Sequence, residues 1–379
     1  MAQADAHFDA GEALLEQGDL AGARQAFDRA VLVYLKAPGG AYAHDGTAEA
    51  YRRMVEAILA RERAASATDD GQAPYPGTSF DLTALRIAAH PLEPARRAAS
   101  EQQETRAGEF PVVLNDAVLS CIDLYQGRLR DWFSAALARG GRYLPLIRRV
   151  FATEGIPEDL AYVALVESAF RVQAVSPARA TGVWQFMSAT ARRFGLRQDP
   201  WVDERHDPEK STRAAARYLK ELHGRFGDWD LALAGYNAGE RRVERAVARH
   251  RTGDFWKLRG TGSLRRETSN YVPLVHAAIA VARSPGDYGF EVLPEPARAA
   301  ETVRAAGGLD LRAASDCAGT TLAEIRLLNP ELRRNLTPPG RAFSLRVPPG
   351  TGPAFEGCLK AAPAGAAGPD PAGHESGLP

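Results

Sequence analysis

A glutamate at the end of an apolar segment is the strongest candidate for chemistry in this sequence. Residues 160–166 read LAYVALV, and Glu167 follows them directly. A helix that is apolar nearly all round is buried, so a carboxylate at its end needs a partner, a raised pKa or an opening to solvent. Taken alone, Glu167 is most simply solvated where the helix surfaces, or paired with one of the many arginines.

The segment after Glu167 favours a chemical role for its carboxyl. It carries polar and aromatic groups suited to holding a sugar: Ser176, Thr181, Gly182, Trp184 and Gln185. A glutamic acid whose pKa is raised by an apolar pocket is the usual general acid for breaking a glycosidic bond. In a purely structural interpretation, Trp184 and Phe186 are core residues and Gly182 is a requirement of the backbone.

Several blocks, in order along the chain, resemble one family. ALVESAF at 164–170 and SPARATGVWQFMSATARRFGL at 176–196 are similar to the catalytic core of the soluble-lytic-transglycosylase-like, lysozyme-related family. Further similar blocks lie at 202–222, 226–243 and 267–280. Within that family the sequence most resembles the membrane-bound lytic transglycosylase D group. Ordered blocks at family-like spacing are a stronger signal than one short motif.

The resemblance implies roles for individual residues. Glu167 matches the family's single catalytic acid/base. Positions implied to bind or line the substrate are Ser176, Gln185, Met187, Tyr236, Asn237 and Tyr271. The resemblance implies neither a metal nor a cofactor, and no metal-ligand spacing occurs in the sequence.

The implied reaction is non-hydrolytic cleavage of the β-1,4 bond between N-acetylmuramic acid and N-acetylglucosamine, which leaves a 1,6-anhydro end. Two alternatives remain open. A lysozyme-type hydrolase usually needs a second carboxylate, and Glu204 is the candidate, although Glu204 and Arg205 are most simply an internal ion pair. A non-catalytic peptidoglycan-binding scaffold is the alternative from another class. His206 receives no role.

The elements that position these residues are predicted to be helices. The fold class expected is mainly α, with a lysozyme-like catalytic lobe over 109–292. Helices are predicted over 157–169 and from about 184 to 194, and another begins at Asp207–Pro208 or at Ser211. A helix that starts at Asp228–Trp229 should break around residues 236–239, and the last core helix should end at Pro285–Gly286.

The region before this lobe resembles a tetratricopeptide helix hairpin. Residues 1–65 form the predicted helical segment, with a turn at Gly18–Asp19, and 66–108 read as linker or irregular surface. One hairpin cannot bury its own apolar face, so it needs a neighbour. It is expected either to form a helical cap on the catalytic lobe or to bind a protein partner.

The region after the lobe changes pattern. Residues 293–352 have a β-α-α-β order that resembles a degenerate LysM module, with Gly308-Leu309-Asp310 where that family has Gly-Asp-Thr. Residues 353–379 read as a disordered tail. Cys317 and Cys358 could form a disulfide or remain buried thiols, whereas Cys121 is expected in the core.

Composition excludes some partners and leaves location open. The 379 residues carry 47 basic and 47 acidic side chains, so bulk charge does not favour nucleic acid or an anionic membrane. The chain has no apolar run long enough to span a membrane, and its first residues do not read as a signal peptide. The family resemblance implies glycan strands as partner and a periplasmic or outer-membrane-associated location. Membrane attachment would then depend on a lost signal or lipid anchor.

Overall fold

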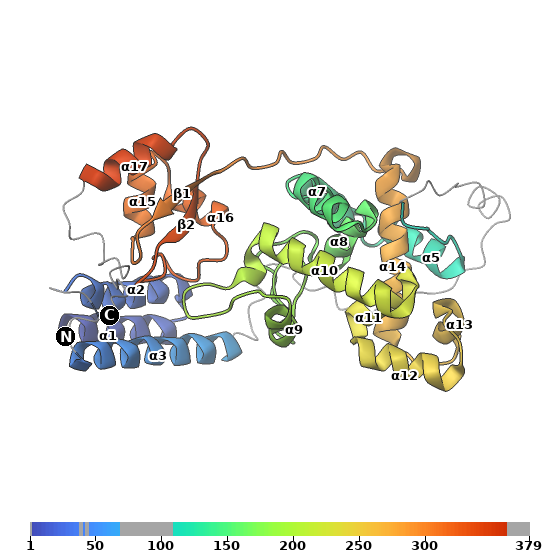
Figure 1. Ribbon diagram of the computed structural model, residues 1–379, viewed down its shortest axis with the longest axis horizontal. Coiled ribbons are helices and arrows are strands. Elements are labelled where there is room, and N and C mark those ends of the chain that lie inside the picture. Colours follow the sequence, from blue (N-terminus) through green and yellow to red (C-terminus); the bar gives the residue numbers. More distant parts are fainter. Residues whose placement is uncertain (1, 38–40, 42–44, 69–108, 362–379) are drawn as a thin grey trace, which may run out of the picture. The chain divides into compact units, whose positions relative to one another are not determined.

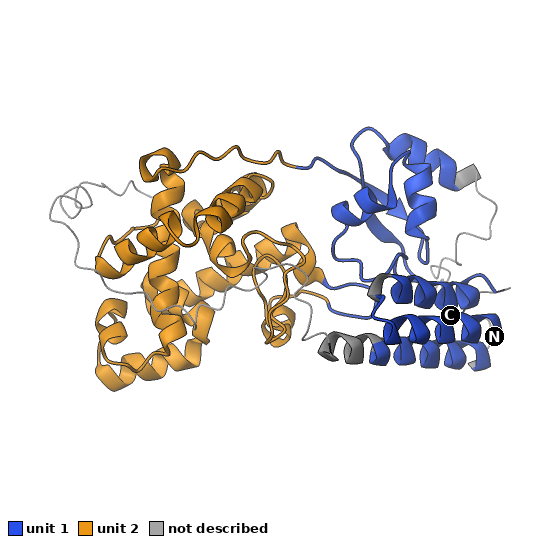
Figure 2. Ribbon diagram, turned by 180° about the vertical axis from the view of Figure 1, so that it is seen from behind, with its two compact units in different colours: residues 1–74, 198–203, 298–379 blue, residues 75–197, 204–297 orange. Residues whose placement is uncertain are grey.

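The computed structural model describes residues 2–37, 41, 45–68 and 109–361. They divide into two compact units (Figure 2). Unit 1 is drawn from residues 1–74, 198–203 and 298–379, and unit 2 from 75–197 and 204–297. Helices dominate the described residues, and the only named strands among them are β1 and β2 (Figure 1), so the mainly α prediction is confirmed.

The described part of unit 2 begins with three helices of three turns each. They are α5 (Asp116–Gln126), α6 (Arg130–Gly140) and α7 (Leu144–Glu154). Asn115 caps α5 by accepting hydrogen bonds from the backbone N–H groups of residues 117 and 118. Gly155 ends α7 in the left-handed region at φ 71°, a conformation that glycine adopts freely. Phe133 and Phe151 are fully buried in the core that these helices share.

The predicted helix at 157–169 is two shorter segments. A 3₁₀ turn, η1 (Glu158–Tyr162), leads into α8 (Val163–Ser168). Pro157 has an extended backbone at ψ 128° and occupies the N-cap position of η1, so it is not the first helical residue. After α8, Ala169 and Phe170 both adopt positive φ, 51° and 58°. Two successive non-glycine residues in the left-handed region are strained, and such a conformation persists only where the surrounding structure holds it. Both side chains are buried, so the packing around them can hold it.

The next helix starts later than predicted. It is α9 (Ser188–Arg193), and residues 184–187 belong to the preceding loop. In that loop Thr181 pairs with both Val175 and Phe186 through isolated β-bridges. Trp184 and Phe186 are buried, as the structural interpretation predicted. Burial of these rings and pairing through Thr181 therefore outweigh the helical pattern of the sequence.

The remaining helices of unit 2 follow the capping signals of the sequence. Asp207 caps α10 (Pro208–Phe226) and Asp228 caps α11 (Trp229–Ala238). Gly239, at φ 82° and ψ 137°, separates α11 from α12 (Glu240–His250), which confirms the predicted break. Three elements complete the unit: α13 (Phe255–Gly260), α14 (Arg266–Arg283) and the 3₁₀ turn η3 (Pro285–Tyr288).

Helix α14 is the buried axis of unit 2. Its residues from 270 to 281 are all buried, and it packs against α5, α8 and α11. The ring of His276 bridges two elements, because its Nδ1 accepts from the Val113 N–H at 3.0 Å and its Nε2 donates to Asp230 at 2.7 Å. Cys121 on α5 is fully buried, as predicted.

Unit 1 contains three N-terminal helices. They are α1 (Ala2–Glu16), α2 (Leu20–Leu35) and α3 (Asp45–Thr68). The predicted turn at Gly18–Asp19 is confirmed, and Asp19 caps α2. A β-carbon at Gly11 would collide with the Phe27 ring, which explains the small residue at that contact. The predicted linker lies almost wholly outside the described residues.

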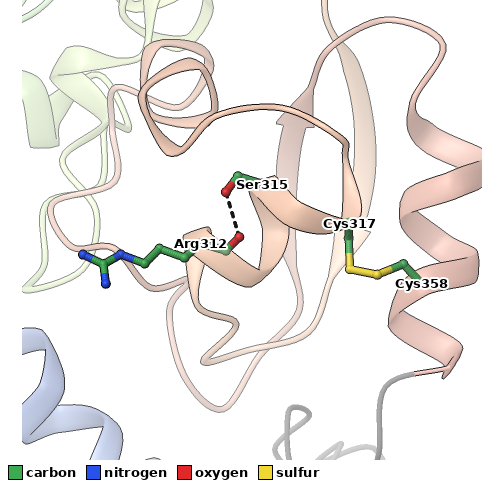
Figure 3. Close-up of a disulfide and its surroundings, with 4 residues drawn as sticks. All are labelled: Arg312, Ser315, Cys317 and Cys358. Atoms are coloured by element: carbon green, nitrogen blue, oxygen red, sulfur yellow. Dashed lines mark hydrogen bonds between the residues drawn. A yellow bond between two sulfur atoms is a disulfide. The ribbon is translucent and has the colours of Figure 1, made fainter.

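The C-terminal module of unit 1 has the predicted β-α-α-β order. Strand β1 (Glu301–Ala305) pairs antiparallel with β2 (Phe343–Val347), and α15 (Leu311–Cys317) and α16 (Leu322–Leu328) lie between them in sequence. The prediction of a disordered tail from residue 353 is wrong for its first part, because α17 (Gly352–Ala361) follows β2. Phe355 is fully buried, and Cys358 forms a disulfide with Cys317 (Figure 3), which settles that open alternative.

The N-terminal helices belong to the same unit as this module. On α2, Asp28 accepts a hydrogen bond from the Asn335 N–H at 3.1 Å and lies 3.6 Å from the Arg334 guanidinium. Leu336 is buried in the apolar cluster of the N-terminal helices. The hairpin therefore finds a neighbour for its apolar face within unit 1, in the C-terminal module.

Residues 198–203 are a further part of unit 1. Val202 bridges to Leu332, the Asp203 N–H donates to the Glu331 carbonyl, and the Trp201 carbonyl accepts from the Arg333 N–H, both at 2.9 Å. The Arg334 guanidinium lies over the Trp201 ring, 5.6 Å from its centroid.

Candidate active site

Glu167 lies at the end of α8 and is partly buried. The hydroxyl of Tyr271, which comes from the buried axis α14, donates a 2.6 Å hydrogen bond to its Oε1. Tyr271 itself is fully buried. The chain therefore delivers a carboxyl and a phenol to one point from segments 104 residues apart.

Burial raises the pKa of Glu167 to about 7, from an ordinary value of 4.5. The Tyr271 hydrogen bond lowers this pKa, and the negative charge of Glu267 raises it. Near neutral pH the carboxyl is therefore present in both protonation states. Such a group can donate a proton and then accept one, which is what an acid/base catalyst near its working pH requires.

Tyr236 and Asn237 lie at the end of α11. The Tyr236 hydroxyl donates to the Trp184 carbonyl at 2.8 Å, and its ring packs beside Tyr218. Burial, and then the charge of Glu167, raise the pKa of Tyr236 well above its usual value, so the phenol stays protonated. The Asn237 side-chain oxygen accepts from Thr268 at 2.8 Å.

The other predicted substrate residues lie on the loop between α8 and α9. Ser176 closes a tight turn by accepting the Ala180 N–H at 3.0 Å. Gln185 adopts φ 47° and donates its amide to the Gly182 carbonyl at 2.8 Å. Met187 is 47% exposed, which is unusual for a large apolar side chain and leaves it available to a ligand. Among the described residues, none of these three side chains hydrogen-bonds to Glu167.

Two residues escaped the sequence interpretation. Ser168 is buried and donates to the Val183 carbonyl at 2.8 Å, which ties α8 to the following loop. Its position directly after Glu167 is the only sequence feature that could have singled out Ser168. Glu267, in the first turn of α14, is the carboxylate whose charge acts on Glu167. The match of residues 267–280 to a family block pointed to this segment without singling out Glu267.

The prediction of an ion pair between Glu204 and Arg205 is wrong. Glu204 instead accepts from Lys210 at 2.6 Å and from the Arg197 N–H at 2.7 Å. Arg205 donates to the carbonyls of Arg179 and Phe186, both at 3.1 Å. The two side chains point to different partners because the 3₁₀ turn η2 (Glu204–His206) places consecutive residues on different sides. His206, which received no role, hydrogen-bonds to the Val172 carbonyl at 2.6 Å.

Neither a metal cluster nor a membrane-spanning helix is found in the part of the chain that the structure describes. No three His, Cys, Asp or Glu side chains there are grouped so that they could hold a metal ion. No helix there is both long enough and apolar enough to cross a bilayer.

Two family models match this chain. Residues 147–259 match the model described as "Transglycosylase SLT domain". Residues 299–364 match "Lytic transglycosylase MltD, LysM-like domain". The first match contains Glu167 and the loop after it, and the second covers the C-terminal module. Both agree with the family resemblance of the sequence.

Individual proteins are also similar to this chain. The membrane-bound lytic murein transglycosylase D of Escherichia coli (strain K12) is 32% identical over 208 residues, which are 53% of this chain and 45% of that protein. A protein named for tributyltin chloride resistance from Alteromonas sp. (strain M-1) is 42% identical over 112 residues, 29% of this chain and 54% of that protein. The chain thus spans about half the length of these curated relatives.

Among solved structures, the 70 kDa soluble lytic transglycosylase from Escherichia coli matches with a TM-score of 0.37 and 21% identity. That match covers 76% of this chain and 47% of the other.

Proposed function

We propose that this chain is a peptidoglycan lytic transglycosylase, because residues 147–259 match the transglycosylase SLT domain and residues 299–364 match the LysM-like domain of lytic transglycosylase MltD. It would cut the β-1,4 bond between N-acetylmuramic acid and N-acetylglucosamine and leave a 1,6-anhydro end. The observation that carries the proposal is the Glu167 carboxyl, with its pKa near 7 and its hydrogen bond from Tyr271, inside the matched domain.

In the first step, neutral Glu167 donates its proton to the oxygen between the two sugars. The bond from that oxygen to C1 of the muramic acid breaks, and N-acetylglucosamine leaves as an alcohol. The acetamido oxygen of the muramic acid shares the positive charge that develops at C1. The Glu167 carboxylate then takes the proton of the O6 hydroxyl while O6 bonds to C1. Glu167 thereby regains the proton that it donated in the first step, so one carboxyl serves as acid and then as base.

The surrounding residues would orient the carboxyl and hold the glycan. Tyr271 fixes the position of Oε1 by its hydrogen bond. Gln185 keeps its side-chain carbonyl available for a sugar, because its contacts to the loop are made by the amide nitrogen. Met187 offers exposed apolar surface to a sugar face or an acetamido methyl group. Ser176, Tyr236 and Asn237 would shape the loop and turn that border the glycan.

A hydrolytic lysozyme is less well supported. Such an enzyme usually places a second carboxylate to activate water or to act as nucleophile. Glu204 is engaged by the Lys210 ammonium and by a backbone N–H, which leaves it poorly suited to that task. Glu267 acts on Glu167 through its charge and is the remaining candidate.

A peptidoglycan substrate would put the protein in the cell envelope. The relatives' names include "membrane-bound" and "murein". The LysM-like module would then contribute to holding glycan strands, although its Gly308-Leu309-Asp310 departs from the usual motif.

The test is mass spectrometry of the soluble products released from purified peptidoglycan, before and after borohydride reduction. We expect muropeptides lighter by one water than the hydrolysis product and resistant to reduction. Reducible ends would instead indicate a hydrolase, and the search for a water-activating group would begin at Glu267. Binding to sacculi without any release would favour the scaffold.

A further inference from the structure

The loop from Arg171 to Met187 is held in an unusual backbone conformation. Three of its residues have positive φ: Arg179 at 62°, Gly182 at 83° and Gln185 at 47°. Only glycine adopts this region freely, so the other two positions depend on contacts from outside the loop. The loop connects directly to the candidate site, because its Val183 and Trp184 carbonyls accept from Ser168 and Tyr236.

The outside contacts come from η2 (Glu204–His206). The Arg205 guanidinium donates to the Arg179 carbonyl and to the Phe186 carbonyl, both at 3.1 Å. These two acceptors lie on opposite sides of Gly182, so one side chain bridges both arms of the loop. A β-carbon at Gly182 would collide with the Arg205 carbonyl oxygen, which shows how closely the loop backbone lies against η2.

The turn η2 is itself firmly held. Glu204 accepts from the Arg197 N–H and from Lys210 on α10. Asp207, directly after η2, is buried and caps α10. Both hydrogen bonds come from Nη1 of Arg205, whose two N–H donors are fixed in the guanidinium plane, whereas a lysine ammonium sits on a flexible stem without that fixed direction.

We infer that Arg205 is a positioning residue for glycan cleavage, because it fixes the arms of the 171–187 loop and thereby the places of Gln185 and Met187. Its side chain acts on the loop backbone and not on Glu167 or the reacting atoms. The inference rests on the proposed function for its kinetic part. A displacement of about 1 Å of groups that orient a substrate can cost about 100-fold in rate, so loosening the loop should be measurable.

The experiment compares R205A with R217A in the full chain. Arg217 is a matched control, since it is an exposed arginine of unit 2 that also donates to a backbone carbonyl, that of Phe194, at 3.0 Å. We expect R205A to lower kcat/KM about 10- to 100-fold. R205K should recover little, and millimolar guanidinium should restore part of the turnover of R205A only. R217A should match wild type.

A second measurement does not depend on activity. Hydrogen exchange should accelerate in R205A at residues 174–187, where the N–H groups of Thr181, Gly182 and Phe186 are hydrogen-bonded, and should not change in α10 or α14. Unchanged exchange in this loop, or kinetics equal to those of R217A, would overturn the inference. Accelerated exchange throughout unit 2 would also overturn it, by assigning Arg205 a general stabilising role. If wild type released no products, the proposed function would fail while the exchange result still decided the positioning.

Discussion

The Tyr271 hydroxyl donates a 2.6 Å hydrogen bond to Oε1 of Glu167, and this contact joins the buried helix α14 to the end of α8. It opposes the effect of burial, since it favours the ionised carboxyl that burial disfavours. The pKa near 7 therefore reflects opposing influences, of which burial is the largest. Each of the residues that set this balance gives a separate prediction.

Replacing Glu167 by glutamine should remove activity without unfolding the protein. General acid/base groups contribute about 100- to 10,000-fold in rate, and here one residue would serve both steps. The measurement is release of soluble muropeptides by E167Q, with circular dichroism and sacculus binding as controls for the fold. Release at the wild-type rate would contradict the assignment of the carboxyl.

The same substitution should change how stability depends on pH. The folded pKa of Glu167, about 7, exceeds its ordinary value of 4.5, so between these values the folded state binds more protons than the unfolded state. Stability contributed by this group therefore falls as pH rises through that window. We expect E167Q to be more stable than wild type at pH 8, by on the order of 1–3 kcal/mol, and nearly equal at pH 4. The check is thermal unfolding at both pH values, and a difference independent of pH would count against the raised pKa.

Tyr271→Phe should move the pH profile to higher pH. Removing the hydrogen bond removes the influence that lowers the pKa of Glu167, so the pKa rises. Because the acid form is needed to protonate the leaving oxygen, activity falls as pH passes the pKa, and this limb should shift upward. The rate at the optimum should also fall about tenfold, since a hydrogen bond to a charged group is lost. A profile of kcat/KM against pH tests both effects.

Glu267→Gln should move the same limb in the opposite direction. The charge of Glu267 raises the pKa of Glu167, so a neutral side chain at 267 lets that pKa fall. Glu209→Gln is a suitable control, because Glu209 is exposed and pairs with Arg213 within α10. Shifts of equal sign in Y271F and E267Q would show that at least one of these residues does not act on the pKa of Glu167 in this way.

Loss of the Cys317–Cys358 disulfide should destabilise the C-terminal module. The bond links α15 to α17 across 41 residues (Figure 3), and a loop of that length is worth about 4 kcal/mol in the chain-entropy account. We expect the double serine variant to unfold at a lower denaturant concentration than oxidised wild type, and wild type in reductant to behave like it. Coincident unfolding curves would contradict a formed disulfide.

Local signals in the sequence were sufficient for much of the fold. Asp207 and Asp228 each precede a helix that they cap, and Gly239 breaks the chain between two helices, so short-range chemistry fixed those boundaries. Glu167 was recognisable because a carboxylate at the end of an apolar run is physically costly.

Long-range contacts decided what the sequence did not reveal. Gln185 lies in a left-handed conformation between the buried rings of Trp184 and Phe186, so a helical pattern there was misleading. The role of Arg205 depends on carbonyls of residues 179 and 186, which no side-chain pattern encodes. Helix α17 was hidden by an Ala, Gly and Pro composition, and its anchors are the burial of Phe355 and the bond to Cys317.

The segment 198–203 affects the design of a fragment that contains unit 2 without the C-terminal module. It leaves unit 2 after Arg197, pairs with the C-terminal module through Val202, and returns at Glu204. A fragment truncated after residue 297 would keep residues 198–203 but lose the C-terminal module that they pair with. The side chain of Val202, which is buried in the full chain, would then be exposed to solvent. A soluble fragment therefore needs both the truncation after residue 297 and the replacement of residues 198–203. The Glu204 N–H and the Arg197 carbonyl are 2.9 Å apart in their hydrogen bond, so a short turn could replace the six residues between them.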